Sequence, residues 1–319
     1  MLAACVPRVK PHVQCYACAP HMSARHENLG PAAALAALTV IWGYNWIVMK
    51  LALVDAPALT FSALRSLLSA GALFVVLLAL RRPLRPARGA SLVLLGLLQT
   101  MGFVGFAALA LKTGAAGKSA VLAYTMPFWT LLLAGPLLGE RMRPAQWPAV
   151  ALAAAGLIGI LSPWSESLDL TASLYSLGAA ASWAASNIVA KRMALEGREL
   201  LNVSAWQMVF GGLGLGLLAM TLEAEPVNWT GTFVVTLTYN VVLATALAWL
   251  LWLYALNRLS AGATGLASLG SPVIALFAAW LQLGELPTRS EAFGMLLIVV
   301  ALAWLSVVGW RRFSRAAAA

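Results

Sequence analysis

Residues Gly117–Glu140 read GKSAVLAYTMPFWTLLLAGPLLGE, and a related stretch, GATGLASLGSPVIALFAAWLQLGE, follows 145 residues later at Gly262–Glu285. Each copy opens on glycine, has a proline ten residues on (Pro127 and Pro272) and closes on Gly-Glu. A proline inside an apolar helix of about 20 residues removes a backbone hydrogen bond and bends the helix. The two copies therefore predict two bent helices, hinged at Pro127 and Pro272, in a chain built from two related halves.

The composition places these helices in a membrane. The chain is 61% hydrophobic and only 10% charged, whereas soluble proteins carry about 25% charged residues. The net charge of +10 comes from basic residues at the ends of apolar runs, which indicates membrane topology rather than a nucleic-acid partner. We expect an all-α integral membrane protein with ten transmembrane helices, at about 31–50, 58–80, 90–111, 117–138, 144–162, 171–192, 201–222, 231–256, 262–283 and 290–310.

The repeat extends beyond the bent helices. The run WGYNWIVMK at Trp42–Lys50 is matched by WAASNIVAK at Trp183–Lys191, with Trp, Ile, Val and Lys in register 141 residues apart. Helices one to five are therefore expected to repeat as helices six to ten. Because five is an odd number, the second half must enter the membrane from the opposite side. Such inverted repeats around a central cavity are typical of secondary transporters.

The distribution of Lys and Arg predicts the orientation. With the N-terminus inside, 16 basic residues fall on the cytoplasmic side and 4 on the outer side, so both termini are expected in the cytoplasm. We expect a disordered leader over residues 1–30, a first five-helix repeat at 31–165, a second, inverted five-helix repeat at 166–310, and a basic cytoplasmic tail at 311–319.

The leader holds all three Cys and all three His residues of the chain. The pair Cys15 and Cys18 does not make a zinc site, because no second pair of ligands follows at a matching spacing. We therefore expect no metal site. Met22 is an alternative start, which would leave residues 1–21 outside the natural protein.

A second motif, at Lys112–Ser119, ends like a phosphate-binding P-loop. The glycine that should open it is replaced by Lys112, and a membrane helix rather than a strand precedes it. Nucleotide binding is not expected at this motif. We accordingly expect no cofactor and no ATPase subunit as a partner.

The ten helices, the Trp-Gly-x-Asn start at Trp42–Asn45 and the two Pro…Leu-Gly-Glu segments resemble the EamA-type drug/metabolite transporters over nearly all of residues 30–310. Within that family the chain looks most similar to the YddG-type amino-acid exporters. The resemblance implies a basket-shaped fold around a central cavity, in a bacterial inner membrane, and the export of amino acids such as aromatic ones, Met or Thr. Carriers of nucleosides, sugars or cationic drugs remain alternatives, because family membership alone does not choose a substrate.

The interiors of the predicted helices contain no Asp, Glu or His, which argues against an intramembrane enzyme. Neutral polar and aromatic side chains remain to line the cavity, since polar groups in membrane helices face inward. The candidates for substrate binding are Trp42, Asn45, Gln99, Phe103, Tyr124, Trp183, Asn187, Thr245, Trp249, Ser268 and Ser271. Trp46, Trp129 and Trp280 are further deep rings. Arg65, the one charge well inside a helix, either reaches outward to the membrane surface or holds a carboxylate at the cavity mouth.

Such a lining suits a zwitterion with an apolar or aromatic side chain. We expect a secondary transporter, not an enzyme, which exports small zwitterionic metabolites such as amino acids by alternating access. Its partners would be a small-molecule substrate and membrane lipid. A channel, the less favoured alternative, would need a ring of like groups or a continuous polar stripe, which the sequence lacks.

Overall fold

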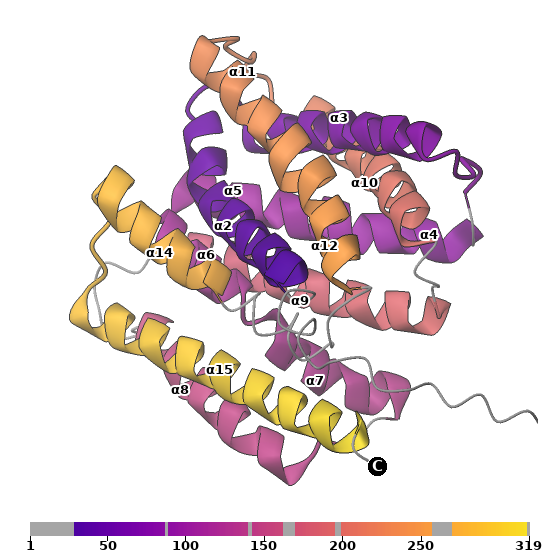
Figure 1. Ribbon diagram of the computed structural model, residues 1–319. Coiled ribbons are helices and arrows are strands. Elements are labelled where there is room, and N and C mark those ends of the chain that lie inside the picture. Colours follow the sequence, from indigo (N-terminus) through magenta and orange to yellow (C-terminus); the bar gives the residue numbers. More distant parts are fainter. Residues whose placement is uncertain are drawn as a thin grey trace, which may run out of the picture.

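The computed structural model describes residues 29–86, 89–139, 142–161, 170–194, 199–256 and 270–317, and this part of the chain contains helices and no strand (Figure 1). In chain order the elements are α2 (Leu29–Ala52), α3 (Ala58–Ala79), α4 (Gly89–Leu95), η1 (Gly96–Val104), α5 (Gly105–Thr113), α6 (Ala116–Ala123), α7 (Met126–Leu138), η2 (Pro144–Gln146), α8 (Trp147–Leu161), α9 (Leu170–Met193), α10 (Leu200–Leu222), α11 (Gly231–Thr238), η3 (Tyr239–Leu247), α12 (Ala248–Leu256), α14 (Gly270–Leu283) and α15 (Arg289–Ala317). The predicted leader, with its Cys and His residues, lies outside the described residues except for its last two positions.

Eight stretches of helix in the described part are long and apolar enough to cross a membrane. They are Ala33–Ala52, Ala58–Ala79, Gly89–Thr113, Ala116–Leu138, Pro144–Leu161, Leu200–Leu222, Gly231–Trp252 and Arg289–Val308. The other two predicted segments correspond to α9, which is 24 residues long but rich in Ala and Ser, and to α14, of which 14 residues are described. The all-helical membrane class is thus confirmed, while the number ten stays a prediction.

Helices far apart in the sequence lie side by side: α3 with α10, α8 with α15, and α2 with α14 (Figure 1). Glycines make the closest of these approaches possible. A Cβ added at Gly211 of α10 would lie 2.4 Å from the carbonyl oxygen of Gly96 in η1. A Cβ added at Gly156 of α8 would lie 2.6 Å from the carbonyl oxygen of Gly294 in α15. These glycines therefore serve close helix packing within the chain.

The first of the two predicted bent helices is broken rather than bent. Tyr124 and Thr125 form a turn between α6 and α7, and Pro127 is the second residue of α7. In the first turn of a helix proline's missing N–H is not needed, so the prediction of a proline deep inside one helix is wrong here. The hydroxyl of Thr125 donates to the carbonyl of Leu122 (2.6 Å) and accepts from Trp129 Nε1 (3.2 Å), which satisfies polar groups at the break.

The two Leu-Gly-Glu sequences are helix ends of the same geometry. Gly139 follows α7 with φ of 70°, and Gly284 follows α14 with φ of 63°, a left-handed backbone that favours glycine. The carboxylate of Glu285 then accepts hydrogen bonds from the backbone N–H groups of Ala116 (3.0 Å) and Gly117 (3.1 Å). The first N–H groups of α6 have no partner within the helix, and an anion at this position stabilises them. In this way the end of one repeated segment caps the beginning of the other.

Two membrane spans contain π-helical turns in their middle. η1 interrupts the span that starts at Gly89, and η3 interrupts the span that starts at Gly231. The Thr245 hydroxyl donates to the carbonyl of Asn240, five residues earlier, at 2.9 Å. The two turns occupy the third and eighth of the ten predicted segments, which are counterparts in the predicted repeat. π-Helical turns are rare and often mark functional sites.

Candidate functional site

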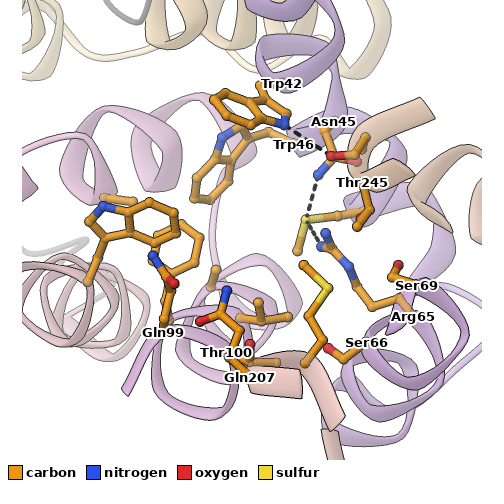
Figure 2. Close-up of a pocket in the computed structure, with 18 of the residues that line it drawn as sticks. Trp42, Asn45, Trp46, Arg65, Ser66, Ser69, Gln99, Thr100, Gln207 and Thr245 are labelled. Atoms are coloured by element: carbon orange, nitrogen blue, oxygen red, sulfur yellow. Dashed lines mark hydrogen bonds between the residues drawn. The ribbon is translucent and has the colours of Figure 1, made fainter. Parts of the chain in front are cut away.

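A cavity of about 180 Å³ lies between the two halves, near the midpoints of the spans that surround it (Figure 2). Its walls come from α2, α3, η1, the α6–α7 break, α9, α10 and η3, with α12 adding one ring. The lining includes these residues among the predicted candidates: Trp42, Asn45, Gln99, Phe103, Tyr124, Trp183, Thr245 and Trp249. Both π-helical turns, η1 and η3, contribute several residues to the cavity lining.

Aromatic rings make up much of the wall. Phe103 and Trp183 meet edge to face, with ring centroids 4.7 Å apart and an angle of 63° between the rings. Trp46 lies 6.5 Å from Tyr124, centroid to centroid. Trp42 donates its indole N–H to the carbonyl of Ala244 in η3 (3.0 Å), which fixes the ring. The rings are thus held in place by the protein itself and offer flat apolar surfaces to a bound molecule.

Arg65 of α3 brings a positive charge to this lining. Its guanidinium donates to the sulfur of Met49 on α2, at 2.9 Å, and this sulfur also accepts from the amide of Asn45 at 3.3 Å. The described lining residues include no Asp and no Glu. The sequence left two interpretations of Arg65 open. The side chain points to the cavity (Figure 2), so the interpretation that it reaches out to the membrane surface is wrong.

Three polar atoms at the cavity are buried and have no hydrogen-bond partner among the residues that the structure describes. They are Asn45 Oδ1, Ser69 Oγ and Gln207 Oε1. Buried polar atoms are nearly always paired, and leaving one unpaired costs about 1–3 kcal/mol. All three residues line the cavity, so their unpaired atoms lie beside the space that a bound molecule would occupy.

A second hollow, of about 420 Å³, lies next to the central one. Met126 and Trp183 line both spaces, so they form the partition between them. The second hollow also contains Arg143 and Asn187, and the Asn187 amide donates to the Thr130 hydroxyl at 3.4 Å. Its lining comes from α7, from η2 and the residue before it, and from the second halves of α9 and α15, all on one side of the central cavity.

Two of the predicted binding residues lie elsewhere. Asn187 lines the second hollow instead of the central one. Ser271 is fully buried, and its hydroxyl donates to the carbonyl of Thr39 (3.3 Å), so that it joins α14 to α2 next to Pro272. Ser268 lies outside the described residues.

Two of the further tryptophan rings that were expected deep in the protein, Trp129 and Trp280, do not line the cavity. Trp280 is 47% exposed and packs against Phe277, on a face of α14 that turns away from the cavity. Trp129 is bonded to Thr125 at the helix break and is absent from the lining. A helical period predicts which residues share a face but not which face meets the cavity.

The sequence reasoning missed several lining residues: Met49, Ser66, Ser69, Thr100, Met126, Gln207 and Met208. A signal was available for Gln207, because the repeat aligns it with Arg65 as the polar residue of Phe-Ser-Ala-Leu-Arg and Val-Ser-Ala-Trp-Gln. Ser69 follows Arg65 by four residues, on the same face of α3, and Ser66 lies three residues before Ser69. The methionines gave no signal, since Met is common in apolar helices.

Comparison with known proteins identifies relatives of the whole chain. The EamA-like transporter family matches residues 30–162 and again residues 170–307. An uncharacterized transporter, YoaV of Bacillus subtilis, is 32% identical over 82% of this chain and 91% of its own. A probable amino-acid metabolite efflux pump of Salmonella typhimurium is 29% identical over 86% of this chain and 93% of its own. A crystal structure with 19% identity superimposes with a TM-score of 0.62, over 88% of this chain and 98% of that one, and supports the fold alone.

Proposed function

Because the chain belongs to the EamA-like transporter family, it is a multi-pass membrane transporter rather than an enzyme, and we propose that it exports amino acids. The observation that carries this proposal is the central cavity, whose walls combine aromatic rings with amide and hydroxyl groups. Such walls suit a zwitterion with an apolar or aromatic side chain, such as an aromatic amino acid, Met or Thr. The name of the Salmonella relative, a probable amino-acid metabolite efflux pump, supports the same substrate class.

The proposed architecture is ten transmembrane helices in two inverted repeats, at 31–165 and 166–310. The two separate family matches support this division. So do the paired features of the halves: a π-helical turn in the third segment of each, and a left-handed glycine after each Pro-containing helix. The basic residues at the helix ends favour cytoplasmic termini and an inner-membrane location.

Alternating access requires that the cavity be closed at one end at a time. Hydrogen bonds between the halves join the end of the molecule at which α2, α10 and α14 finish. Glu223 accepts from the N–H groups of Leu59 and Thr60, both at 2.8 Å, and Lys118 pairs with Glu291 at 2.8 Å. In the proposed orientation this is the outer end, and the second hollow lies on the cytoplasmic side. Bonds between the halves also lie at the opposite end, but the second hollow lies there as well, and we therefore assign the structure to a state that is closed to the outside.

Substrate would reach the cavity from the second hollow, past Met126 and Trp183. The rings at Trp42, Phe103, Trp183 and Trp249 would hold its side chain, while polar groups such as Asn45, Gln99 and Thr245 would hold its charged end. The break at Tyr124 and Thr125, with Pro127 beside it, would be the hinge of the first half. Pro272, in the first turn of α14, would have the same role in the second half. A positive charge at Arg65 disfavours the alternative of a cation carrier.

The proposal is tested by transport of labelled amino acids into proteoliposomes that contain the purified protein. We expect uptake of aromatic amino acids, Met or Thr above the level of protein-free vesicles, and competition by unlabelled amino acids but not by nucleosides or sugars. An imposed pH gradient shows whether protons are coupled to transport. Absence of uptake for every amino acid, with nucleosides or sugars transported instead, would overturn the proposal.

A further inference from the structure

The guanidinium of Arg65 is poorly satisfied within the protein. An arginine side chain carries five N–H donors, and a thioether sulfur is only a weak acceptor. The hydrogen bond to Met49 Sδ, at 2.9 Å, is the contact that this side chain makes with the other described residues. A positive charge inside a membrane protein is costly unless an anion or several acceptors surround it. The geometry around Arg65 thus has room for an anionic group that is not part of the chain.

The remaining polar groups of the cavity have the opposite requirement. In the described part of the chain, the buried acceptors Gln207 Oε1 and Asn45 Oδ1 have no donor, and Gln207 is only 2% exposed. Ser69 Oγ is unpaired as well, and a hydroxyl can either donate or accept. Figure 2 shows Arg65, Asn45 and Gln207 around the open centre of the cavity, on three different helices. The cavity therefore offers a place for an anion at Arg65, and a rotation of either amide toward the open centre would offer its oxygen to an N–H donor.

We propose that Arg65 binds the carboxylate of the substrate and that Gln207 Oε1 and Asn45 Oδ1 bind its ammonium group. This assignment rests on the proposed function and specifies its ligand: an α-amino acid with both charged groups free. A guanidinium fits a carboxylate well, because two parallel N–H groups match its two oxygens. A phosphate ester would place further acceptors against the two unpaired amide oxygens, and an amine without a carboxylate would be repelled by Arg65.

The first test uses the unaltered protein in detergent, with radiolabelled L-phenylalanine as the probe. Competition is measured with L-phenylalanine amide and phenethylamine, which lack the carboxylate, and with 3-phenylpropionate, which lacks the ammonium. Loss of one charged hydrogen-bonded contact weakens binding by about 10- to 100-fold. We expect each of the three analogues to compete that much more weakly than L-phenylalanine itself. Equal competition by the amide or by phenethylamine would overturn the role of Arg65.

The second test uses variants of the two key residues. Arg65→Met removes the guanidinium and its charge and keeps an unbranched apolar stem, and we expect it to weaken L-phenylalanine binding about 10- to 100-fold. It should also abolish the preference for L-phenylalanine over its amide, whereas Arg65→Lys should retain part of it. Gln207→Met should weaken L-phenylalanine binding but leave 3-phenylpropionate binding unchanged. Arg289→Met, at an exposed arginine that is the first residue of α15, is the matched control.

The possible outcomes separate this inference from the proposed function. If the unaltered protein transports amino acids and Arg65→Met binds them equally well, the carboxylate site is wrong and the transport function stands. If no amino acid is transported but 3-phenylpropionate binds in an Arg65-dependent manner, the carboxylate site stands and the transport function is wrong. A variant that fails to fold is recognised by size-exclusion chromatography, and the competition series on the unaltered protein then decides.

Discussion

Gly211 shows how much the packing of a membrane protein can depend on one residue. It lies where α10 meets η1, and an added Cβ would come within 2.4 Å of both Gly96 O and Thr100 Cβ. Thr100 is itself part of the cavity wall. Without a hydrophobic driving force between helices in lipid, such close backbone contacts hold the bundle together.

We predict that Gly211→Ala destabilises the protein, because the extra methyl group forces α10 away from η1. Overpacking of this kind costs about 1–3 kcal/mol, more than alanine gains in helix propensity. The midpoint of thermal unfolding in detergent measures the effect. The control is Gly71→Ala in α3, where nothing lies within 4 Å of the added atom. If both variants unfold at the same temperature, the contact between α10 and η1 is not important for stability.

The residues of the cavity were only partly predictable from the sequence. Rings and amides in the interior of an apolar helix are unusual, so Trp42, Asn45 and Phe103 could be named as candidates. The presence of a ring in an apolar helix did not predict the place of Trp280, because such a ring can equally face lipid. For Arg65 the sequence allowed two directions, since a long side chain about two turns from a helix end can reach either the surface or the interior.

At the scale of helices, the sequence predicted the spans better than their interruptions. Long apolar runs bounded by charges define membrane helices, and eight of them are found where they were expected. The break at Tyr124 and Thr125 lies just before the proline that signalled it, and the side chain of Thr125 stabilises it. The π-helical turns η1 and η3 were not predicted, since their sequences are as apolar as those of regular helices. Packing against distant helices, rather than local preference, determines these turns.

We predict that Pro127→Ala slows transport several-fold. Alanine restores the N–H group at position 127 and favours helix, so α6 and α7 would tend to join into one straighter helix and the hinge would stiffen. Initial rates of amino-acid uptake in proteoliposomes measure the effect, for this variant and for Pro272→Ala. Pro136→Ala is the matched control, because Pro136 lies inside α7 on its exposed side. Wild-type rates in both Pro127→Ala and Pro272→Ala would refute the hinge.

At the scale of the whole molecule, a group of polar contacts joins the two halves at the end where α2, α10 and α14 finish. Glu223 caps α3, Glu285 caps α6, and Asp55 accepts from the hydroxyl of Thr230 at 2.7 Å. Each of these contacts joins one half to the other at the same end of the molecule. A small set of part-buried and exposed polar contacts can break and form repeatedly, as a gate must.

The ion pair of Lys118 and Glu291 provides a way to test this gate. These residues, 2.8 Å apart at their charged atoms, join α6 of the first half to α15 of the second. The native cysteines, Cys5, Cys15 and Cys18, all lie in the leader and are first replaced by serine. In that background, the double variant Lys118→Cys, Glu291→Cys is made, and its two introduced thiols are linked by a reducible bifunctional thiol reagent. We predict that the link stops transport and that reduction restores it, because an end that cannot open cannot release substrate to the outside. Each single cysteine variant, treated in the same way, should keep its activity; if the linked protein also does, this end of the molecule is not a gate.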